Sequence, residues 1–379
     1  MLVLGLMSGT SADGIDAALV RFSGNPKRPK WKLINFSYFP YPQNLKNNIL
    51  DISQGGKFTT QQFIELSEEI TNCNIQAALS CDPKSKANLV GCHGQTVAHR
   101  ASSKGVRGAS LQIIQAPLFA NILGVPVVTD FRAADIAFGG QGAPLVPAPD
   151  KALFGIDDGW QALLNLGGIA NLTLIPPKQG IYKSFDVIGW DCGPANSLID
   201  LAIIKFTKGK CFYDRNGLYA SKGSPNTQII DNWLKESYFL MNPPKSTGRE
   251  QFGRADLERR LQDMSHLSKS DQISTLTSFT ARIVAQDLEK VYKRNLIRPV
   301  EIVLAGGGCR NPVLRDEINR RCRGMRFATI DEKGIPAESR EALSFALLAW
   351  WHFLKIPGNA PSVTGAKKSV VLGTLDLPR

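Results

Sequence analysis

Two stretches of this chain share one plan, in which a glycine-containing turn separates two apolar runs. The first covers residues 2–21 and the second covers residues 161–175. Apolar runs on both sides of a tight polar turn predict a β-hairpin. A chain of 379 residues is long enough for two domains of ordinary size, and the repeat favours two lobes with one hairpin each. We expect the first lobe at residues 1–131 with 345–379 and the second at residues 132–344.

The tip of the first hairpin has a composition that suits a phosphate group. Gly9 and Gly14 offer unhindered backbone N–H groups, and three hydroxyl side chains lie in the same turn. Asp13 and Asp16 add hard oxygens for Mg²⁺. The turn lacks the Lys-Ser/Thr of a P-loop, and a strand rather than a helix follows it. One such turn alone is better interpreted as structural, whereas two hairpins that face each other across a cleft could hold the phosphates of one nucleotide.

The chain is basic, with 45 Lys and Arg against 33 Asp and Glu and a net charge of +12. Such a charge suits nucleic acid, an acidic membrane face or small anionic ligands. The basic residues are spread without interleaved aromatic residues, and the local clusters at residues 27–30 and 320–323 are interpreted as solvated surface. We therefore expect a polyanionic nucleotide, and not nucleic acid, as the partner.

The sequence carries no signal for secretion or for a membrane. Its seven cysteines include no C-x-x-C pair and their number is odd, so neither a disulfide framework nor a zinc site is indicated. No basic region precedes the N-terminal apolar run, which breaks at Ser8. The apolar run at residues 342–354 is shorter than the roughly 20 residues that span a bilayer. We expect a soluble cytoplasmic protein.

Polar residues follow the strand expected near residue 90. Residues 88–97 predict a short strand that runs into a polar loop with His93, Gln95 and Thr96. Ligand-binding groups of open α/β sheets gather at such strand ends, and this favours substrate contact over simple hydrogen bonding for the group.

A charged loop precedes the second hairpin. It contains Asp130, Arg132 and Asp135 together with three glycines. Arg132 either forms a fork with a carboxylate of a ligand or pairs with Asp135 to hold the loop.

The second lobe contains a candidate general base. Residues 184–200 predict a strand that leads into a helix, with Asp191 near the end of the strand. A carboxylate at this place, in front of a helix N-terminus with free N–H groups, suits general-base catalysis. A helix N-cap and a Mg²⁺ ligand are the alternatives for Asp191.

Two later segments add candidates. Residues 300–312 predict a strand, a turn with Gly306, Gly307 and Gly308, and a helix near Pro312. Because Asn311 stands where a Rossmann motif needs glycine, the triple glycine is interpreted as backbone that lies flat against adenine or ribose. Residues 335–350 predict a capped helix, whose Glu341 either faces the cleft or only complements the helix dipole.

Several motifs together resemble the anhydro-N-acetylmuramic acid kinase family, which is similar to the actin, hexokinase and Hsp70 superfamily. The set is specific although each motif alone is weak, and it covers nearly the whole chain in order. The motifs are residues 6–16, 91–96, 130–132 with 139–147, 165–171, 245–250, 306–312 and 361–366.

The resemblance implies a two-lobed α/β fold of the ribonuclease H-like type, with the ATP and sugar cleft between the lobes, and a homodimer. It implies an enzyme that uses ATP and Mg²⁺ to open the 1,6-anhydro ring of anhydro-N-acetylmuramic acid by hydrolysis and to phosphorylate O6. The products would be ADP and N-acetylmuramic acid 6-phosphate, in peptidoglycan recycling.

The resemblance also assigns roles to residues. Asp191 would deprotonate the attacking water, and Asp13 would contact Mg²⁺. The residues implied for ATP are Gly9, Thr10, Ser11, Ala12, Asp13, Gly14, Ile15, Asp16, Gly167, Gly168, Gly306, Gly307, Gly308 and Asn311. The residues implied for the substrate are His93, Gln95, Thr96, Asp130, Arg132 and Glu341.

Two departures from the family pattern stand close to Asp191 in the sequence. Cys192 and Ala195 replace the usual Thr and Gly, so a hydroxyl is lost and a methyl gained. Two other functions fit the same fold. One is an ordinary sugar or carboxylate kinase whose aspartate deprotonates a substrate hydroxyl, and the other is an ATP-driven switch like actin or a chaperone.

Overall fold

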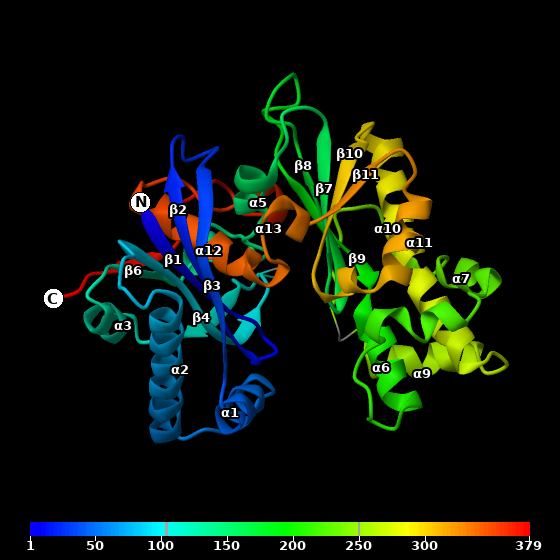
Figure 1. The fold of residues 1–379 in the computed structure, drawn as a ribbon, viewed down its shortest axis with the longest axis horizontal. Coiled ribbons are helices and arrows are strands. Elements are labelled where there is room, and N and C mark those ends of the chain that lie inside the picture. Colours follow the sequence, from blue (N-terminus) through cyan, green and yellow to red (C-terminus); the bar gives the residue numbers. More distant parts are fainter. Residues whose placement is uncertain (103–104, 249–250) are drawn as a thin grey trace. The chain divides into compact units, whose positions relative to one another are not determined.

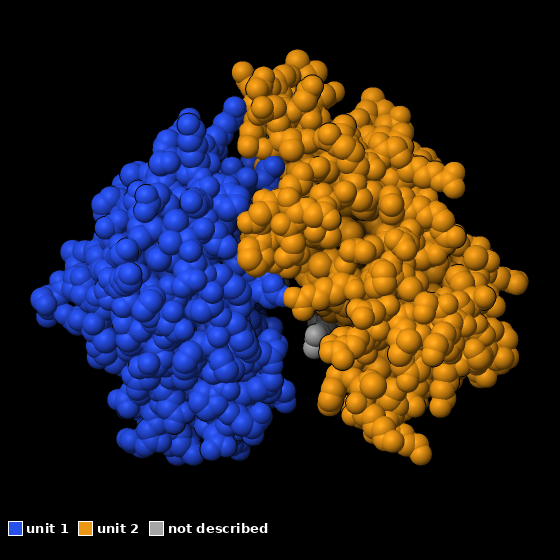
Figure 2. Space-filling view, viewed as in Figure 1, with its two compact units in different colours: residues 1–154, 338–379 blue, residues 155–337 orange. Residues whose placement is uncertain are grey.

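The computed structural model describes residues 1–102, 105–248 and 251–379. The chain divides into two compact units, which Figure 2 colours separately. Unit 1 consists of residues 1–154 and 338–379, and unit 2 consists of residues 155–337.

Unit 1 combines a mixed sheet with helices from both parts of its chain (Figure 1). Its strands are β1 Leu2–Ser8, β2 Gly14–Ser23, β3 Lys30–Pro40, β4 Leu89–Arg100, β5 Ala109–Ile113, β6 Val127–Thr129 and β12 Thr374–Asp376. Its helices are α1 Gln43–Ser53, α2 Thr60–Cys81, α3 Ala116–Leu123, α4 Ala133–Ala137, α5 Pro147–Phe154, α12 Arg340–Phe353 and α13 Pro361–Thr364.

Unit 2 contains a second mixed sheet. Its strands are β7 Trp160–Leu166, β8 Ile169–Ile175, β9 Ile188–Pro194, β10 Pro299–Ala305 and β11 Arg326–Thr329. Its helices are α6 Asn196–Phe206, α7 Thr227–Trp233, α8 Ser237–Leu240, α9 Arg254–Asp263, α10 Lys269–Asn295 and α11 Pro312–Arg321. Short 3₁₀ turns include Gly307–Arg310, which follows β10.

The two sheets share one strand order. In unit 1, β1, β2 and β3 form an antiparallel meander, β4 pairs parallel to β1, and β6 pairs parallel to β4. In unit 2, β7, β8 and β9 form the meander, β10 pairs parallel to β7, and β11 pairs parallel to β10. The two predicted hairpins are therefore the first two strands of each sheet. The repeat confirms the α/β fold with ribonuclease H-like lobes that the sequence predicts.

Helices cover both faces of the sheet in unit 1. Apolar residues of alternate positions, such as Leu4 and Leu6, pack in one core cluster with α2. On the opposite face α12 lies directly on the strands, because a Cβ at Gly5 would stand 1.9 Å from the Ala342 carbonyl oxygen and one at Gly91 would stand 2.4 Å from that of Phe345. Only glycine permits this close approach. The position of α12, and with it Glu341, thus depends on two glycines in the sheet.

Local signals account for several helix ends. Thr59 and Gln62 form the capping box that begins α2, and the side chain of Ser268 caps α10. In unit 2, α6, α10 and α11 contribute to one core cluster with β7, β8 and β9. That packing buries one face of the second sheet.

The unit boundaries differ from the expected lobes, since residues 132–154 and 338–344 belong to unit 1. Arg340 at the start of α12 forms a buried ion pair with Asp150 of α5, with Nε 3.2 Å from Oδ1. Asp135 of α4 accepts a 2.7 Å hydrogen bond from Thr364. The partners in these two contacts lie 190 and 229 residues apart in the sequence. The composition of the loop alone therefore could not predict that it belongs to unit 1.

Candidate functional site

The first glycine turn, residues 9–13, is held in a tight conformation. The backbone N–H of Ala12 donates to the carbonyl of Gly9 at 3.1 Å, and Ala12 is buried at a positive φ of 51°. Thr10, Ser11 and Asp13 are exposed at the tip. The hydroxyls of Thr10 and Ser11 therefore lie on an accessible turn, whereas Ser8 and Gly14, which were also predicted to meet a phosphate, are buried.

Gln95 supports this turn from below. Its Oε1 accepts from Ser8 Oγ at 2.5 Å, and its Nε2 donates to the carbonyls of Gly9 and Thr96 at 3.2 and 3.1 Å. The side chain is fully buried. These contacts make Gln95 a support for the first glycine turn, which differs from the substrate contact that the sequence suggests.

The strand that carries His93, Gln95 and Thr96 is longer than expected. β4 continues to Arg100, so these residues lie inside a strand and not in a loop at its end. The prediction was wrong because β5 pairs with the second half of β4 and extends it. Thr96 is half-buried, and its Oγ1 accepts from Gln112 at 3.2 Å.

His93 and Arg132 form a buried pair in unit 1. His93 Nδ1 lies 2.8 Å from the Gly94 carbonyl oxygen, and its Nε2 lies 3.2 and 2.8 Å from Nε and Nη2 of Arg132. Because a carbonyl oxygen can only accept a hydrogen bond, Nδ1 carries the proton and Nε2 accepts from the guanidinium. Burial, and then the charge of Arg132, lower the pKa of His93 to about 3. His93 is therefore a neutral acceptor that orients Arg132.

Arg132 does not pair with Asp135, which was the structural alternative for this arginine. Its Nη1 donates to the Gly142 carbonyl at 2.6 Å. Asp135 instead accepts from Gly142 N at 2.8 Å and from the side chains of Asn359 and Thr364 at 2.8 and 2.7 Å. The arginine and the carboxylate therefore bind the carbonyl and the N–H of Gly142, respectively, and not each other.

Acidic groups lie near Arg132. Burial, and then the charge of Glu341, raise the pKa of Asp16 to about 6. Burial lowers the pKa of Arg132, while the charge of Glu341 opposes that change. Asp130 sits at a positive φ of 49°, and partial burial raises the pKa of its carboxyl. Unit 1 thus gathers Asp16, Arg132 and Glu341 within electrostatic reach of one another.

Asp13 has a cationic partner. Its carboxylate forms an ion pair with Lys46, and its carbonyl accepts from Tyr38 Oη at 2.8 Å. Partial burial raises the pKa of Asp13, but the hydrogen bonds from Lys46 and Ser11 and the charge of Lys46 together outweigh this, and the net shift is downward. Asp13 is thus anionic near neutral pH.

The second glycine turn packs against α6. The carbonyl of Gly167 accepts from Asn196 N at 3.0 Å, and that of Gly168 accepts from Ala195 N and Ser197 N at 2.9 and 3.0 Å. The expectation of free N–H groups at this helix N-terminus was therefore wrong. The carbonyl oxygens of the glycine turn, which is distant in the sequence, accept hydrogen bonds from the N–H groups of Asn196 and Ser197.

The triple-glycine turn lies beside the second glycine turn. A Cβ at Gly306 would stand 2.5 Å from Asn165 Oδ1, and one at Gly308 would stand 2.7 Å from the Leu166 Cβ. Gly306 also has a positive φ of 81°. A Cβ at Gly307, in contrast, would meet no atom within 4 Å. Gly306 and Gly308 allow the turn to pack closely against Asn165 and Leu166, whereas Gly307 borders open space.

That open space belongs to a cavity of about 650 Å³ in unit 2. Gly307, Gly308 and Asn311 line one part of it, and the exposed rings of Phe212 and Tyr213 line another. Asn311 caps α11, since its Oδ1 accepts from Val313 N and Leu314 N at 3.1 and 3.3 Å. The cavity combines flat backbone with aromatic rings, which suits a nucleobase and its ribose.

Asp191 is held by a loop from elsewhere in unit 2. Its Oδ2 accepts from Ser246 Oγ at 2.9 Å and from Thr247 N at 3.1 Å. Its backbone N–H donates to the Lys245 carbonyl at 2.9 Å, and its carbonyl accepts from Tyr238 Oη at 2.7 Å. Hydrogen bonds to a carboxylate favour its charged form and define its orientation. Asp191 is not a helix N-cap, because α6 begins at Asn196 after Ala195.

A buried ion pair anchors this loop. Lys245 Nζ lies 3.0 Å from Asp287 Oδ1 of α10, and both side chains are almost completely buried. Trp190 Nε1 donates to the other carboxylate oxygen of Asp287 at 3.1 Å. Sequence reasoning missed Lys245, Ser246 and Asp287 as functional candidates, although residues 245–250 belong to a motif of the resemblance. Arg249 and Glu250 of that motif lie outside the described residues.

The two departures near Asp191 lie in the core of unit 2. Cys192 and Ala195 are both buried in the cluster that α6 and α10 cover. The pairing of β9 with β8 is irregular here, because Asn171 pairs with Asp191 and Ala170 with Gly193, so Cys192 lies at a β-bulge. Cys192 is fully buried whereas Asp191 is partly buried, so the lost hydroxyl would lie in the core of unit 2.

Comparison with known sequences identifies relatives over the full length. A sequence model described as anhydro-N-acetylmuramic acid kinase matches residues 1–377. A protein of that description from Prochlorococcus marinus (strain MIT 9313) is 58% identical over 373 residues, which are 98% of this chain and 98% of the relative. One from Synechococcus sp. (strain CC9902) is 55% identical over 379 residues and covers 100% of both chains.

Comparison with solved structures finds distant likeness over most of the chain. The activator of the 2-hydroxyisocaproyl-CoA dehydratase from Clostridium difficile with bound ADPNP is 10% identical, with a TM-score of 0.42, over 92% of this chain and 94% of that one. A ROK family glucokinase from Streptomyces griseus in complex with glucose and AMPPNP is 13% identical, with a TM-score of 0.38, over 92% and 99%. Among the described residues, no helix is long and apolar enough to cross a bilayer.

Proposed function

Because this chain belongs to the anhydro-N-acetylmuramic acid kinase family, we propose residue roles for the reaction of that family. The chain is an ATP-dependent sugar kinase that opens the 1,6-anhydro ring of anhydro-N-acetylmuramic acid and forms N-acetylmuramic acid 6-phosphate and ADP. This reaction serves peptidoglycan recycling.

Asp191 is the general base in this proposal. It takes a proton from water while the water oxygen bonds to the anomeric carbon. The bond from that carbon to O6 breaks, and O6 bonds to the γ-phosphorus of ATP as ADP leaves. Two hydrogen bonds to Oδ2 of Asp191 support this role. Ser246 Oγ donates one at 2.9 Å, and Thr247 N donates the other at 3.1 Å. These hydrogen bonds orient the carboxylate and leave it ionised.

The nucleotide has two sets of contacts in this proposal. The cavity beside Gly307 and Gly308 holds adenine and ribose, and Phe212 and Tyr213 offer apolar surface to the base. The exposed turn of residues 9–13, with Gly14, Ile15 and Asp16 after it, contacts the phosphates. Gly167 and Gly168 act as a support for the first set, because their carbonyls hold the start of α6.

Arg132 and Glu341 are the substrate-binding side chains that the geometry favours. His93 accepts from two nitrogens of Arg132 and so orients the guanidinium, while Gln95 and Thr96 act as structural supports. A planar guanidinium suits the carboxylate of the substrate's lactyl group, with which it can form paired hydrogen bonds. Asp130 is a further candidate for a sugar hydroxyl.

Mg²⁺ is also part of the proposal, with Asp13 as its protein contact. The Asp13 carboxylate stays anionic and therefore suits the cation. Because Lys46 already forms an ion pair with this carboxylate, a metal ion would compete with the lysine. Bound Mg²⁺ would neutralise phosphate charge during transfer. Asp13→Ala should raise the Mg²⁺ concentration for half-maximal activity, and Lys46→Met should lower it. An unchanged Mg²⁺ dependence in both variants would leave Asp13 as a brace of the hairpin.

The resemblance is also the basis for proposing a homodimer and a cytoplasmic location. Light scattering coupled to size-exclusion chromatography measures the first, and fractionation of the source cells measures the second.

One experiment tests the hydrolytic step. Purified protein is incubated with Mg·ATP and anhydro-N-acetylmuramic acid in ¹⁸O-water, and early product is analysed by mass spectrometry. We expect the 6-phosphate with one ¹⁸O at the anomeric carbon. Product without label would favour an ordinary kinase that deprotonates a substrate hydroxyl. ATP consumption at the same rate with and without sugar would favour a switch ATPase.

A further inference from the structure

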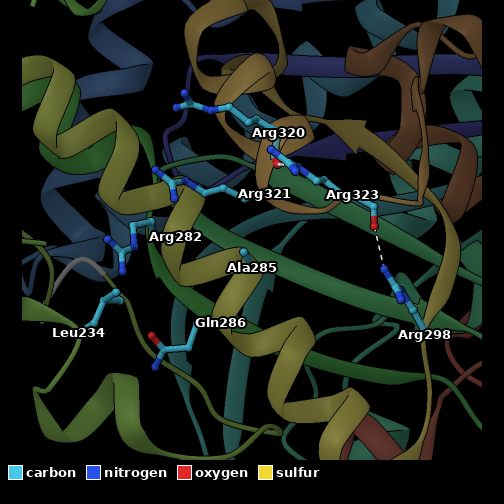
Figure 3. A pocket seen from close by; sticks show the side chains of 8 residues that line it. All are labelled: Leu234, Arg282, Ala285, Gln286, Arg298, Arg320, Arg321 and Arg323. Carbon is cyan, nitrogen blue, oxygen red and sulfur yellow. Dashed lines mark hydrogen bonds between the residues drawn. The ribbon is translucent and has the colours of Figure 1, made fainter. Parts of the chain in front are cut away.

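Unit 2 has a second hollow, of about 640 Å³, whose lining is rich in arginine. Figure 3 shows Arg282 of α10 and Arg321 at the end of α11 on one side of Ala285, and Arg298 and Arg323 on the other. Arg320 completes the group. None of the residues proposed above for nucleotide, sugar or general base lines this hollow. Arg320 and Arg323 are exposed, as the sequence suggests, and together with Arg321 they also line a hollowed part of the surface.

The positive charge of the hollow is only partly balanced. Arg282 pairs with Asp231, and Arg320 and Arg321 share Glu317. Arg298 Nη2 donates to the Arg323 carbonyl at 2.8 Å, and Arg323 Nε donates to the Arg320 carbonyl at 3.3 Å. Across residues 1–102, 105–248 and 251–379, neither Arg298 nor Arg323 has a carboxylate within ion-pair distance.

These backbone contacts fix the Arg298 guanidinium at the Arg323 carbonyl and the Arg323 guanidinium at the Arg320 carbonyl. Like charges in a concave site repel one another, and an anion with several charges relieves that repulsion more than separate small anions do. Burial, and then the charges of Arg282 and Arg320, lower the pKa of Arg321, which is the expected result of such crowding. Guanidinium forks match the oxygens of phosphate groups.

We propose that this hollow binds a small polyphosphate anion with two or more phosphate groups, at a site separate from that of ATP. The described residues that line it include no aromatic ring on which a base could stack. This lack of a stacking surface favours free polyphosphate over nucleic acid.

Inorganic tripolyphosphate is the probe for the test, titrated calorimetrically into the full-length protein. Arg298→Ala/Arg323→Ala should lose one binding event or weaken its Kd at least about tenfold, since two charged hydrogen-bond donors are removed. Ala285→Glu, which places a carboxylate in the hollow, should have the same effect. The matched control is Lys222→Ala/Arg254→Ala, which removes the same charge from exposed positions of unit 2 outside the hollow. The KM for ATP should stay within twofold in all variants.

Each outcome decides the proposal. Loss of the event in both hollow variants, with the control unchanged, supports it. The same stoichiometry and Kd in wild type and hollow variants would overturn it, because the anion would then bind elsewhere. Tighter binding of a short single-stranded RNA than of tripolyphosphate, lost in the same variants, would also overturn it in favour of nucleic acid.

Discussion

Asp191 and Cys192 are neighbours in β9 but have different surroundings. Ser246 and Thr247 hold the carboxylate, while the thiol lies in the apolar core of unit 2. This contrast provides a matched pair of substitutions. Asp191→Asn should lower kcat at least about 10²-fold, as expected for loss of a general base, with ATP binding retained. Cys192→Thr should keep kcat within about threefold. Steady-state kinetics and nucleotide titration measure both, and near-normal turnover of Asp191→Asn would remove Asp191 from the proposed role.

The lowered pKa of His93 predicts that the free energy of unfolding depends on pH. The pKa of its imidazole is about 3 in the folded protein, against an ordinary value near 6.5 in the unfolded chain. The unfolded state therefore binds more protons between these values, and the contribution of His93 to folding is lost as pH falls through that window. The free energy of unfolding should drop by at most about 1.4 kcal/mol per pH unit from this one group.

His93→Gln keeps an acceptor for Arg132 but removes the titration. Wild type should lose stability relative to this variant when the pH falls from 7 to 4, as followed by denaturant unfolding. His266→Gln, at an exposed position, is the control and should parallel wild type. Parallel curves for wild type and His93→Gln would show that His93 is protonated in the folded state.

At the scale of elements, the loop that holds Asp191 depends on the ion pair between Lys245 and Asp287 of α10. Asp287→Asn leaves a buried lysine without its partner, and the expected loss is about 3–5 kcal/mol of unfolding free energy. Lys245→Met/Asp287→Leu removes both charges and should recover most of the melting temperature. If the pair positions the loop, the double variant should still show kcat lowered about tenfold at an unchanged KM for ATP. Recovery of kcat together with stability would make the pair purely structural.

Local sequence signals predicted those elements whose causes are local. The hairpins of both sheets, the capped helix after Thr59 and the helix after Asn311 follow from periodicity, turns and caps. The length of β4 did not follow, because it depends on pairing with β5. In the candidate site, Asp191 was predicted as the general base from its strand and glycine context, and this role stays a prediction. Its hydrogen-bond donors were missed, because Ser246 lies 55 residues away and is placed by tertiary packing.

At the scale of the whole molecule, the two units differ in how the chain forms them. Unit 2 is one continuous segment, whereas unit 1 needs residues 338–379 in addition to residues 1–154. The C-terminal segment supplies α12, which packs directly on Gly5 and Gly91 of the first sheet. Residues 1–154 alone therefore lack the cover of one sheet face, and a domain without that burial is not expected to fold.

This difference predicts the behaviour of fragments. Residues 155–337 expressed alone should melt cooperatively and bind ADP through the cavity beside Gly307, more weakly than the full chain because residues 9–16 are missing. They should have no sugar kinase activity without Arg132 and Glu341. Residues 1–154 should stay unfolded, while a control that joins residue 154 to residue 338 through a Gly-Ser linker should fold. Circular dichroism and ADP titration measure these properties, and an unfolded 155–337 fragment would show that unit 2 needs unit 1 in order to fold.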